Sequence, residues 1–168
     1  SAREFDLAIT IERPKARAVL TSRLANYRLQ FYASPDYLAQ CSDPVTIETV
    51  GNHPLIWYVD AALDEGTLSG LYDLVPDARP AIQTNNIVGQ IHAAEAGLGI
   101  AFLPSYIGDQ RTELRRIATI DEHLPRSYWL SVPRDLSRLG RVRAMVTALQ
   151  QLADRVGSVP SPAGATDH

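Results

Sequence analysis

The sequence predicts an α/β fold, and three observations carry that prediction. Short apolar segments suited to strands alternate along the chain with segments suited to helices. Between Thr84 and Pro104, an N-capped helical pattern leads through a glycine into a short apolar strand. The chain has 168 residues, of which 45% are hydrophobic, so it can bury a core as one domain or two small lobes. The alternation of strands and helices also predicts sheets that are mainly parallel.

Two strands are expected at the start of the chain. Residues 5–11 are rich in apolar and β-branched side chains, and the polar residues 12–18 connect them to the next strand. Residues 22–33 alternate between apolar and polar side chains, so this strand should have one wetter face. Ser34 and Pro35 then open a short helix, because serine caps helices and proline suits the first helical position.

The middle of the chain contains weaker signals. A helical turn is expected after Asp43-Pro44, and residues 55–59 read as a strand. Residues 60–76 lack a strong periodicity, so they are expected to be irregular or weakly helical. Residues 79–84 form a further expected strand, which leads into the segment from Thr84 to Pro104.

The last third of the chain should end in an amphipathic helix. A helical turn is expected at 105–109, followed by strands at 114–117 and 127–132. Residues 140–156 carry an apolar stripe at helical spacing, formed by Val142, Met145, Val146, Leu149, Leu152 and Val156. Residues 157–168 are small, polar and proline-bearing, which predicts a disordered tail.

The segment from Thr84 to Pro104 is the most informative part of the chain. Asn85 or Asn86 can accept backbone N–H groups of the first helical turn. Gly97 suits the left-handed residue that ends a helix, and residues 99–103 suit a strand buried on both faces. One helix face then collects the apolar residues Ile87, Ile91, Ala94 and Leu98. A helix that opens at the end of such a strand favours small anions and polar ligands, so the segment predicts a binding site without a catalytic motif.

Composition argues against several classes of protein. The formal net charge of −3 offers no basic footprint for nucleic acid, and the arginines near residues 111–116 and 134–143 read as solvated helix faces. Cys41 is the only cysteine, so there is no disulfide framework or thiolate metal cluster, and a cytoplasmic protein fits best. No apolar run approaches the roughly 20 residues that span a bilayer, so no membrane partner is expected.

Four segments in this order resemble the effector-binding domain of LysR-type transcriptional regulators. Phe5 to Ile9 resembles the family's strand that leaves the first lobe. Ala33 to Ala39, followed by His53 to Ile56, resembles its strand-to-helix segment. Ala96 to Pro104 resembles the return to the first lobe, and Trp129 to Leu149 resembles the closing strand and helix. The resemblance covers roughly residues 5–155.

The resemblance implies a two-lobed α/β fold of the periplasmic-binding-protein type, with a small effector in the cleft between the lobes. It places part of the first lobe at residues 3–12 and 100–156, and the second lobe at 13–99. Hinge residues would be Ile11, Ala101, Leu103 and Pro104. The family's winged helix-turn-helix, linker helix and opening part of the effector domain have no counterpart here, so the chain is expected to be a fragment with an incomplete first lobe.

The candidate effector-binding residues follow from this placement. Thr84, Asn85 and Asn86 bring a hydroxyl, two amides and free helix N–H groups together, although one asparagine can be simply a cap and the others solvated. Phe102 is a candidate hydrophobic wall or plain core. Adjacent strand positions point to opposite faces, so at most one of Trp57 and Tyr58 faces the cleft. From the first crossover, Thr10 and Glu12 are candidate polar contacts.

Other chemistry is not indicated. The four histidines share no ligand-like spacing, and His92 with Glu95 reads as a surface pair on one helix, so neither a metal nor another cofactor is expected. No Gly-x-Ser-x-Gly motif is present, and the Gly97-x-Gly99 pair lies between helix and strand in the wrong order for a dinucleotide fingerprint. Cys41 has no histidine or basic residue beside it in the sequence.

The leading hypothesis is therefore an effector-sensing module of a transcription regulator and not an enzyme. The expected partners are a small molecule, such as a carboxylic or aromatic acid, and further copies of the chain. DNA would be bound only through the absent winged helix-turn-helix. The alternatives are a solute-binding transport protein of the same fold and an enzyme built on an α/β scaffold.

Overall fold

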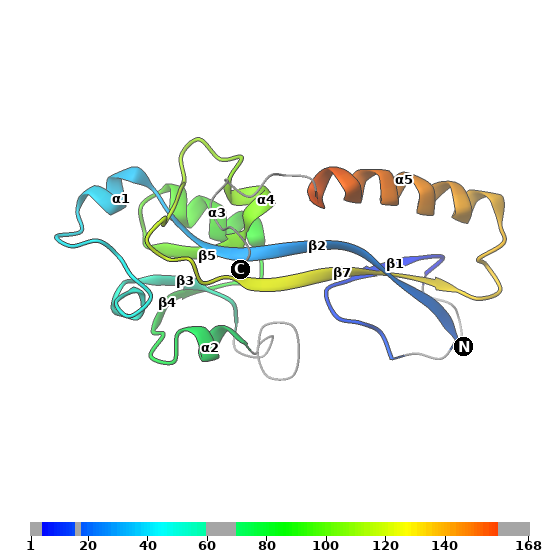
Figure 1. Cartoon of the computed structure of the whole chain (residues 1–168), viewed down its shortest axis with the longest axis horizontal. Coiled ribbons are helices and arrows are strands. Elements are labelled where there is room, and N and C mark those ends of the chain that lie inside the picture. The colour runs from blue at the N-terminus through cyan, green and yellow to red at the C-terminus, as the bar shows by residue number, and fades with distance from the viewer. Residues whose placement is uncertain (1–4, 16–17, 60–69, 158–168) are drawn as a thin grey trace, which may run out of the picture. The chain divides into compact units, whose positions relative to one another are not determined.

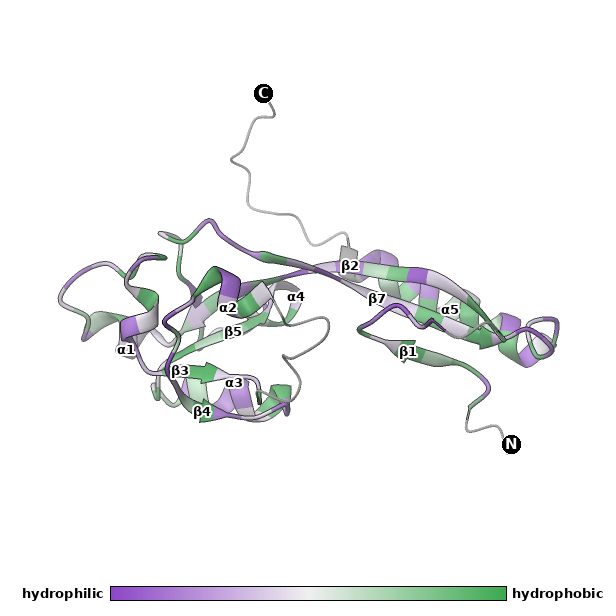
Figure 2. Ribbon diagram, turned by 90° about the horizontal axis from the view of Figure 1, so that it is seen from below, coloured by the Kyte–Doolittle hydropathy of each residue, from purple (hydrophilic) through white to green (hydrophobic). Residues whose placement is uncertain are grey.

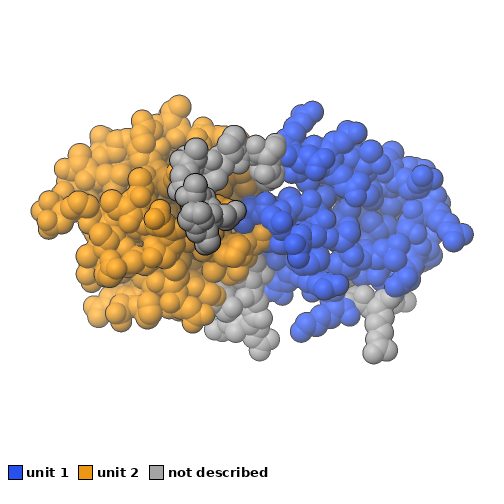
Figure 3. All heavy atoms as spheres, in the orientation of Figure 1, with its two compact units in different colours: residues 1–27, 127–168 blue, residues 28–126 orange. Residues whose placement is uncertain are grey.

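The computed structural model describes residues 5–15, 18–59 and 70–157 (Figure 1). The chain divides into two compact units, shown in Figure 3. Unit 1 contains residues 1–27 and 127–168, and unit 2 contains residues 28–126. The chain passes from one unit to the other within β2 (Val19–Ala33) and again within β7 (Leu124–Pro133). Of the predicted tail, only residue 157 is described, and residues 60–69 of the predicted irregular segment also lie outside the described residues.

Unit 2 is built on a mixed sheet with the strand order β2-β5-β3-β4, and β6 (Arg115–Arg116) pairs with β2. Strands β3 (Leu55–Trp57), β4 (Pro80–Gln83) and β5 (Ile100–Pro104) are parallel to one another. Strand β2 runs antiparallel to both β5 and β6. The prediction of mainly parallel sheets is therefore wrong outside β3, β4 and β5, because the long strand β2 runs against the direction of its neighbours.

The helices of unit 2 are short. They are α1 (Pro35–Ala39), α2 (Gly70–Leu74), α3 (Ile87–Glu95) and α4 (Ser105–Gly108), with the 3-10 turn η1 at Val50–Asn52. Ser34 caps α1 as expected, since its hydroxyl accepts the Tyr37 N–H at 3.2 Å. Helix α3 packs on the sheet through Ile91 and Ala94, which join Ile56, Ala101 and Leu103 in a buried cluster. Strands β3 and β5 are correspondingly apolar (Figure 2).

Two glycines determine how the chain leaves α3. Gly97 has a φ of 73°, the left-handed conformation expected for the residue that ends the helix. The Leu98 N–H reaches back to the Ala93 carbonyl at 3.1 Å, which closes the last turn. Leu98 itself is 53% exposed and does not share the buried face predicted for it, because the turn at Gly97 carries it away from the helix. A Cβ on Gly99 would lie 2.1 Å from the Pro54 carbonyl oxygen, so only glycine fits there.

Unit 1 has a smaller hydrophobic core than unit 2. Strand β1 (Ala8–Thr10) is shorter than the predicted strand at 5–11, and it pairs antiparallel with β7. Helix α5 (Gly140–Gly157) covers a cluster around Leu130, Val132 and Val142. Within the predicted apolar stripe of α5, Met145 and Leu152 are 51% and 56% exposed, whereas Val142 is buried. Ala153 is buried instead of Leu152 because residues spaced by 4, 7 and 11 from Val142 share the covered face.

The unit boundaries differ from the predicted lobe boundaries. Residues 13–27 belong to unit 1 and residues 100–126 to unit 2. The reason lies in strand pairing, because β5 is hydrogen-bonded to β2 on one side and to β3 on the other within unit 2.

Candidate functional site

The predicted effector-binding residues belong to both units. Thr10 and Glu12 lie in unit 1, and the others lie in unit 2. In unit 2 the central feature is the junction between β4 and α3. Asn86 is the N-cap of α3, and its side-chain oxygen accepts the N–H groups of Val88 at 3.0 Å and Gly89 at 3.3 Å. The Thr84 hydroxyl oxygen accepts the Asn86 N–H at 3.1 Å. The side chains of Thr84 and Asn86 therefore hold the turn between β4 and α3 in place.

Asn85 ties this junction to the end of β3. Its side-chain oxygen accepts the Val59 N–H at 3.1 Å, and the Thr84 N–H donates to the Trp57 carbonyl at 2.9 Å. Both asparagines use their oxygens in these bonds. Across the part of the chain that the structure describes, neither Nδ2 group forms a hydrogen bond, so these two exposed amide donors remain available to a ligand.

Gln90 is a residue that sequence reasoning missed. Its side chain is fully buried, and its Nε2 donates to the Thr84 carbonyl at 2.7 Å. Its Oε1 has no hydrogen-bond partner among the residues that the structure describes. Buried polar atoms are nearly always paired, so this unpaired acceptor beside the Thr84 turn is an exception. The only sequence signal was a polar residue one position before the buried Ile91.

The three aromatic candidates separate into two groups. Trp57 and Phe102 are fully buried, and their rings stack with centroids 6.1 Å apart, so both belong to the core. Tyr58 is half-buried and its hydroxyl donates to the Phe102 carbonyl at 3.1 Å. Of these two neighbours Tyr58 is the more accessible, and the expectation that at most one of Trp57 and Tyr58 faces the cleft stays a prediction.

In unit 1, Thr10 and Glu12 lie at and just after the end of β1. The Thr10 hydroxyl donates to the Glu12 carbonyl at 2.6 Å, and Thr10 pairs with Trp129 of β7. The guanidinium groups of Arg13 and Arg23 lie 5.3 and 5.4 Å from the centroid of the Trp129 ring, within the range of cation–π contacts. The sequence pattern held no signal for this grouping, because its members come from three distant segments.

The predicted hinge residues lie in different surroundings. Ile11 is exposed in unit 1, 48% of its surface being accessible. Ala101, Leu103 and Pro104 are buried inside β5, paired with β2, and therefore lie within unit 2. The chain changes unit instead between residues 27 and 28 and between 126 and 127.

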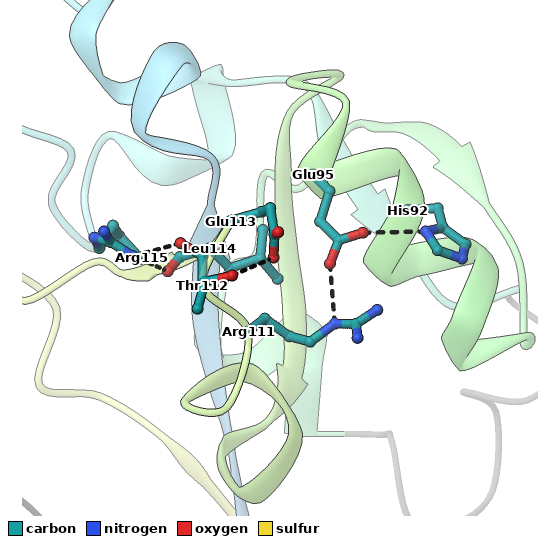
Figure 4. A network of polar contacts seen from close by, with 7 residues as sticks. All are labelled: His92, Glu95, Arg111, Thr112, Glu113, Leu114 and Arg115. Atoms are coloured by element: carbon teal, nitrogen blue, oxygen red, sulfur yellow. Dashed lines mark hydrogen bonds and ion pairs between the residues drawn. The ribbon is translucent and has the colours of Figure 1, made fainter.

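Titratable groups elsewhere form structural contacts. The predicted pair of His92 and Glu95 is present at 3.0 Å, and Arg111 joins it through an ion pair of 2.9 Å to the other carboxylate oxygen (Figure 4). Arg115 donates to the carbonyls of Thr112 and Leu114. These arginines lie on a loop and on β6, so the prediction of a solvated helix face is wrong for them.

The described residues 5–15, 18–59 and 70–157 contain neither a metal-ligand cluster nor a membrane-spanning helix. No cluster of three or more histidine, cysteine, aspartate or glutamate side chains in those ranges could hold a metal ion. None of the helices in the same ranges has the length and apolar composition that a bilayer-spanning segment needs. Cys41 contacts the Tyr37 carbonyl at 3.5 Å, and burial raises the pKa of the Tyr37 phenol.

Comparison with known proteins decides the family. A sequence model described as the LysR substrate-binding domain matches residues 1–154. The chain belongs to this family. The family groups domains of transcription regulators, not enzymes. The iron-regulated virulence regulatory protein IrgB of Vibrio cholerae is 32% identical over 110 residues, which are 63% of this chain and 37% of IrgB. The chain therefore spans little more than a third of that relative.

Solved structures of LysR regulatory domains share the fold. The CrgA regulatory domain from Neisseria meningitidis has a TM-score of 0.68 at 17% identity, covering 90% of this chain and 76% of that one. The AmpR effector domain of Pseudomonas aeruginosa has a TM-score of 0.67 at 18% identity, covering 90% and 73%. A CcmR regulatory domain from Synechocystis, in complex with 2-PG, has a TM-score of 0.63 at 18% identity, covering 94% and 76%. The α/β fold is therefore the periplasmic-binding-protein-like fold of LysR regulatory domains.

Proposed function

We propose that this LysR substrate-binding domain senses a small effector and thereby controls a transcription regulator. The observation that carries the proposal is the family match over residues 1–154. The polar junction at Thr84 to Asn86 supports it, since that turn is held by defined bonds and still presents two unused amide donors. An effector acts only through its different affinities for two arrangements of the regulator.

The site chemistry favours an effector with acceptor oxygens, such as a carboxylic or aromatic acid. Amide Nδ2 groups of Asn85 and Asn86 donate hydrogen bonds, and a carboxylate is a strong acceptor. Of the three aromatic candidates, Tyr58 is the one accessible to a ring, because Trp57 and Phe102 are buried in the core. The solved structure of the CcmR regulatory domain in complex with 2-PG supports ligand binding by domains of this fold.

The partners of the whole regulator follow the family. We propose that it forms homo-oligomers in the cytoplasm and that DNA is bound by a winged helix-turn-helix outside this chain. Apolar side chains of unit 1 such as Met145 and Leu152 are about half exposed, and apolar surface of this kind marks association sites when it is contiguous. Light scattering should then give a mass above the 18.5 kDa of the chain. A monomer at all concentrations would contradict this part of the proposal.

The second candidate, a solute-binding transport protein of the same fold, has less support. The relative IrgB is a regulatory protein, and the structural neighbours described above are regulatory or effector domains. These relatives favour a transcription regulator over a transport protein.

A thermal-shift screen tests effector binding directly. The purified protein is heated with single carboxylic acids, aromatic acids and amino acids. A ligand present at 100 times its Kd adds about 2.7 kcal/mol to the free energy of unfolding. That raises the midpoint of a domain of this size by several degrees.

Variants then locate the site of any hit. Asn85→Ala removes an amide donor and the bond to Val59, and we expect it to weaken effector binding about tenfold or more. Asn26→Ala is the matched control in unit 1, where Asn26 accepts the Ser127 hydroxyl. Unchanged affinity in both Asn85→Ala and Thr84→Val would exclude this junction as the effector site.

A further inference from the structure

A separate polar hollow lies before β3 and β4, at the opposite strand ends from the Thr84 junction. Ligand pockets in general measure about 300 to 1,000 Å³, and this hollow has a volume of ≈ 610 Å³. The turn Gly51–Pro54, which precedes β3, forms one wall. Asp77 and Arg79, which precede β4, and Ala81 of β4 form the other.

Two opposite charges line this hollow, one on Asp77 and one on Arg79. Asp77 and Arg79 are exposed and stand two positions apart. Neither side chain forms an ion pair or hydrogen bond with the other or with any further residue in the described ranges. Both charged groups are therefore free to bind a ligand without first breaking a contact.

The walls of the hollow are held in place. A Cβ on Gly51 would lie 3.3 Å from the Val75 side chain, so the two walls pack closely at their base. Pro54 is fixed by the Ile100 N–H, which donates to its carbonyl at 2.9 Å. His53 is oriented by a hydrogen bond of 2.9 Å between its Nδ1 and the Tyr37 hydroxyl, which leaves Nε2 as the second polar atom of the ring.

We propose that this hollow binds a free α-amino acid. The Arg79 guanidinium suits the carboxylate, because its paired N–H groups match two carboxylate oxygens. Asp77 suits the ammonium group of the same molecule, and the Asn52 amide and His53 ring offer further hydrogen bonds. A ligand with only one charge contacts only one of these two side chains, so the zwitterion forms the larger number of charged contacts. This site is distinct from the proposed effector site at Thr84 to Asn86.

The first experiment is a titration of the ¹⁵N-labelled protein with each standard amino acid, followed by NMR. At least one amino acid should shift the amide signals of residues 51–53 and 77–81 in a saturable manner. The matching amine without a carboxylate and the matching acid without an amine should each bind about tenfold more weakly or worse. An effector at the other site should shift the amides of residues 84–89 instead, so the two proposals fail or succeed separately.

Variants test the assigned contacts. Asp77→Asn and Arg79→Gln should each weaken amino-acid binding by about tenfold or more, while Asp43→Asn and Arg28→Gln, exposed residues of the same unit, should not. Ala81→Tyr should block the hollow without changing its charge. Circular dichroism of every variant checks that the fold is intact.

Two results would overturn the proposal. One is the absence of saturable shifts at residues 51–53 and 77–81 for every amino acid. The other is an affinity that survives in Asp77→Asn, Arg79→Gln and Ala81→Tyr alike, since binding would then occur elsewhere.

Discussion

Unit 2 and unit 1 bury their apolar side chains to very different extents. In unit 2, Ile56, Ala101 and Leu103 are completely buried between strand neighbours and α3. In unit 1, α5 covers a smaller cluster, and Ile9, Met145 and Leu152 are 46–56% exposed. Unit 2 therefore has the more complete core of its own, whereas unit 1 presents apolar side chains that favour association with a further surface.

The largest difference between the units should be seen at two glycines. Gly99→Ala in unit 2 places a Cβ 2.1 Å from the Pro54 carbonyl oxygen at a φ of 151°, so we expect a loss of about 3 kcal/mol or more. Gly140→Ala in unit 1 meets nothing within 4 Å and should change stability by less than about 0.5 kcal/mol. Urea unfolding of both variants measures this. Equal losses would mean that the close approach at Gly99 relaxes without cost.

Replacing one leucine by alanine in each unit compares the stability that each core provides. Leu103→Ala removes a fully buried side chain from unit 2 and should cost about 2–5 kcal/mol. Leu152→Ala removes a side chain that is 56% exposed in unit 1 and should cost less than 1 kcal/mol by the same measure. If the loss of stability in Leu152→Ala is larger and varies with protein concentration, this side chain is covered in an oligomer.

The pH dependence of unfolding should carry a contribution from Tyr32 of unit 2. Burial, followed by the hydrogen bond to Asp109, raises the pKa of the Tyr32 phenol above its usual value of about 10. The native state then holds this proton more tightly than the unfolded state, so the stabilisation is complete below pH 10 and falls as the pH rises further. Urea titrations at alkaline pH measure the slope. Tyr32→Phe should have a shallower slope than the wild-type protein.

The smallest effect is expected at the cap of α3. Asn86→Ala removes the acceptor of two backbone N–H groups and should cost about 1 kcal/mol. Asn86→Ser retains a capping oxygen and should cost a few tenths of a kcal/mol. Thermal unfolding compares the two variants. If serine proves as costly as alanine, the amide of Asn86 stabilises the junction in another way than by capping.

Local patterns were sufficient where one segment determines its own structure. The cap at Asn86, the end of α3 at Gly97 and the Ser34-Pro35 helix start were all confirmed, because each depends on side-chain-to-backbone bonds within a few residues. The order of four family-like segments likewise predicted the LysR domain and its fold. The effector role of Thr84, Asn85 and Asn86 stays a prediction.

Tertiary structure decided everything that depends on contacts between distant segments. The antiparallel pairing of β2 with β5 and the unit boundary inside β2 arise from hydrogen bonds between residues about 70 positions apart. The burial of Trp57 and Phe102 and the buried amide of Gln90 also follow from packing. The sequence by itself determined the local turns, caps and family of this protein. Its accessible residues were settled only by folding, because burial depends on which strands become neighbours.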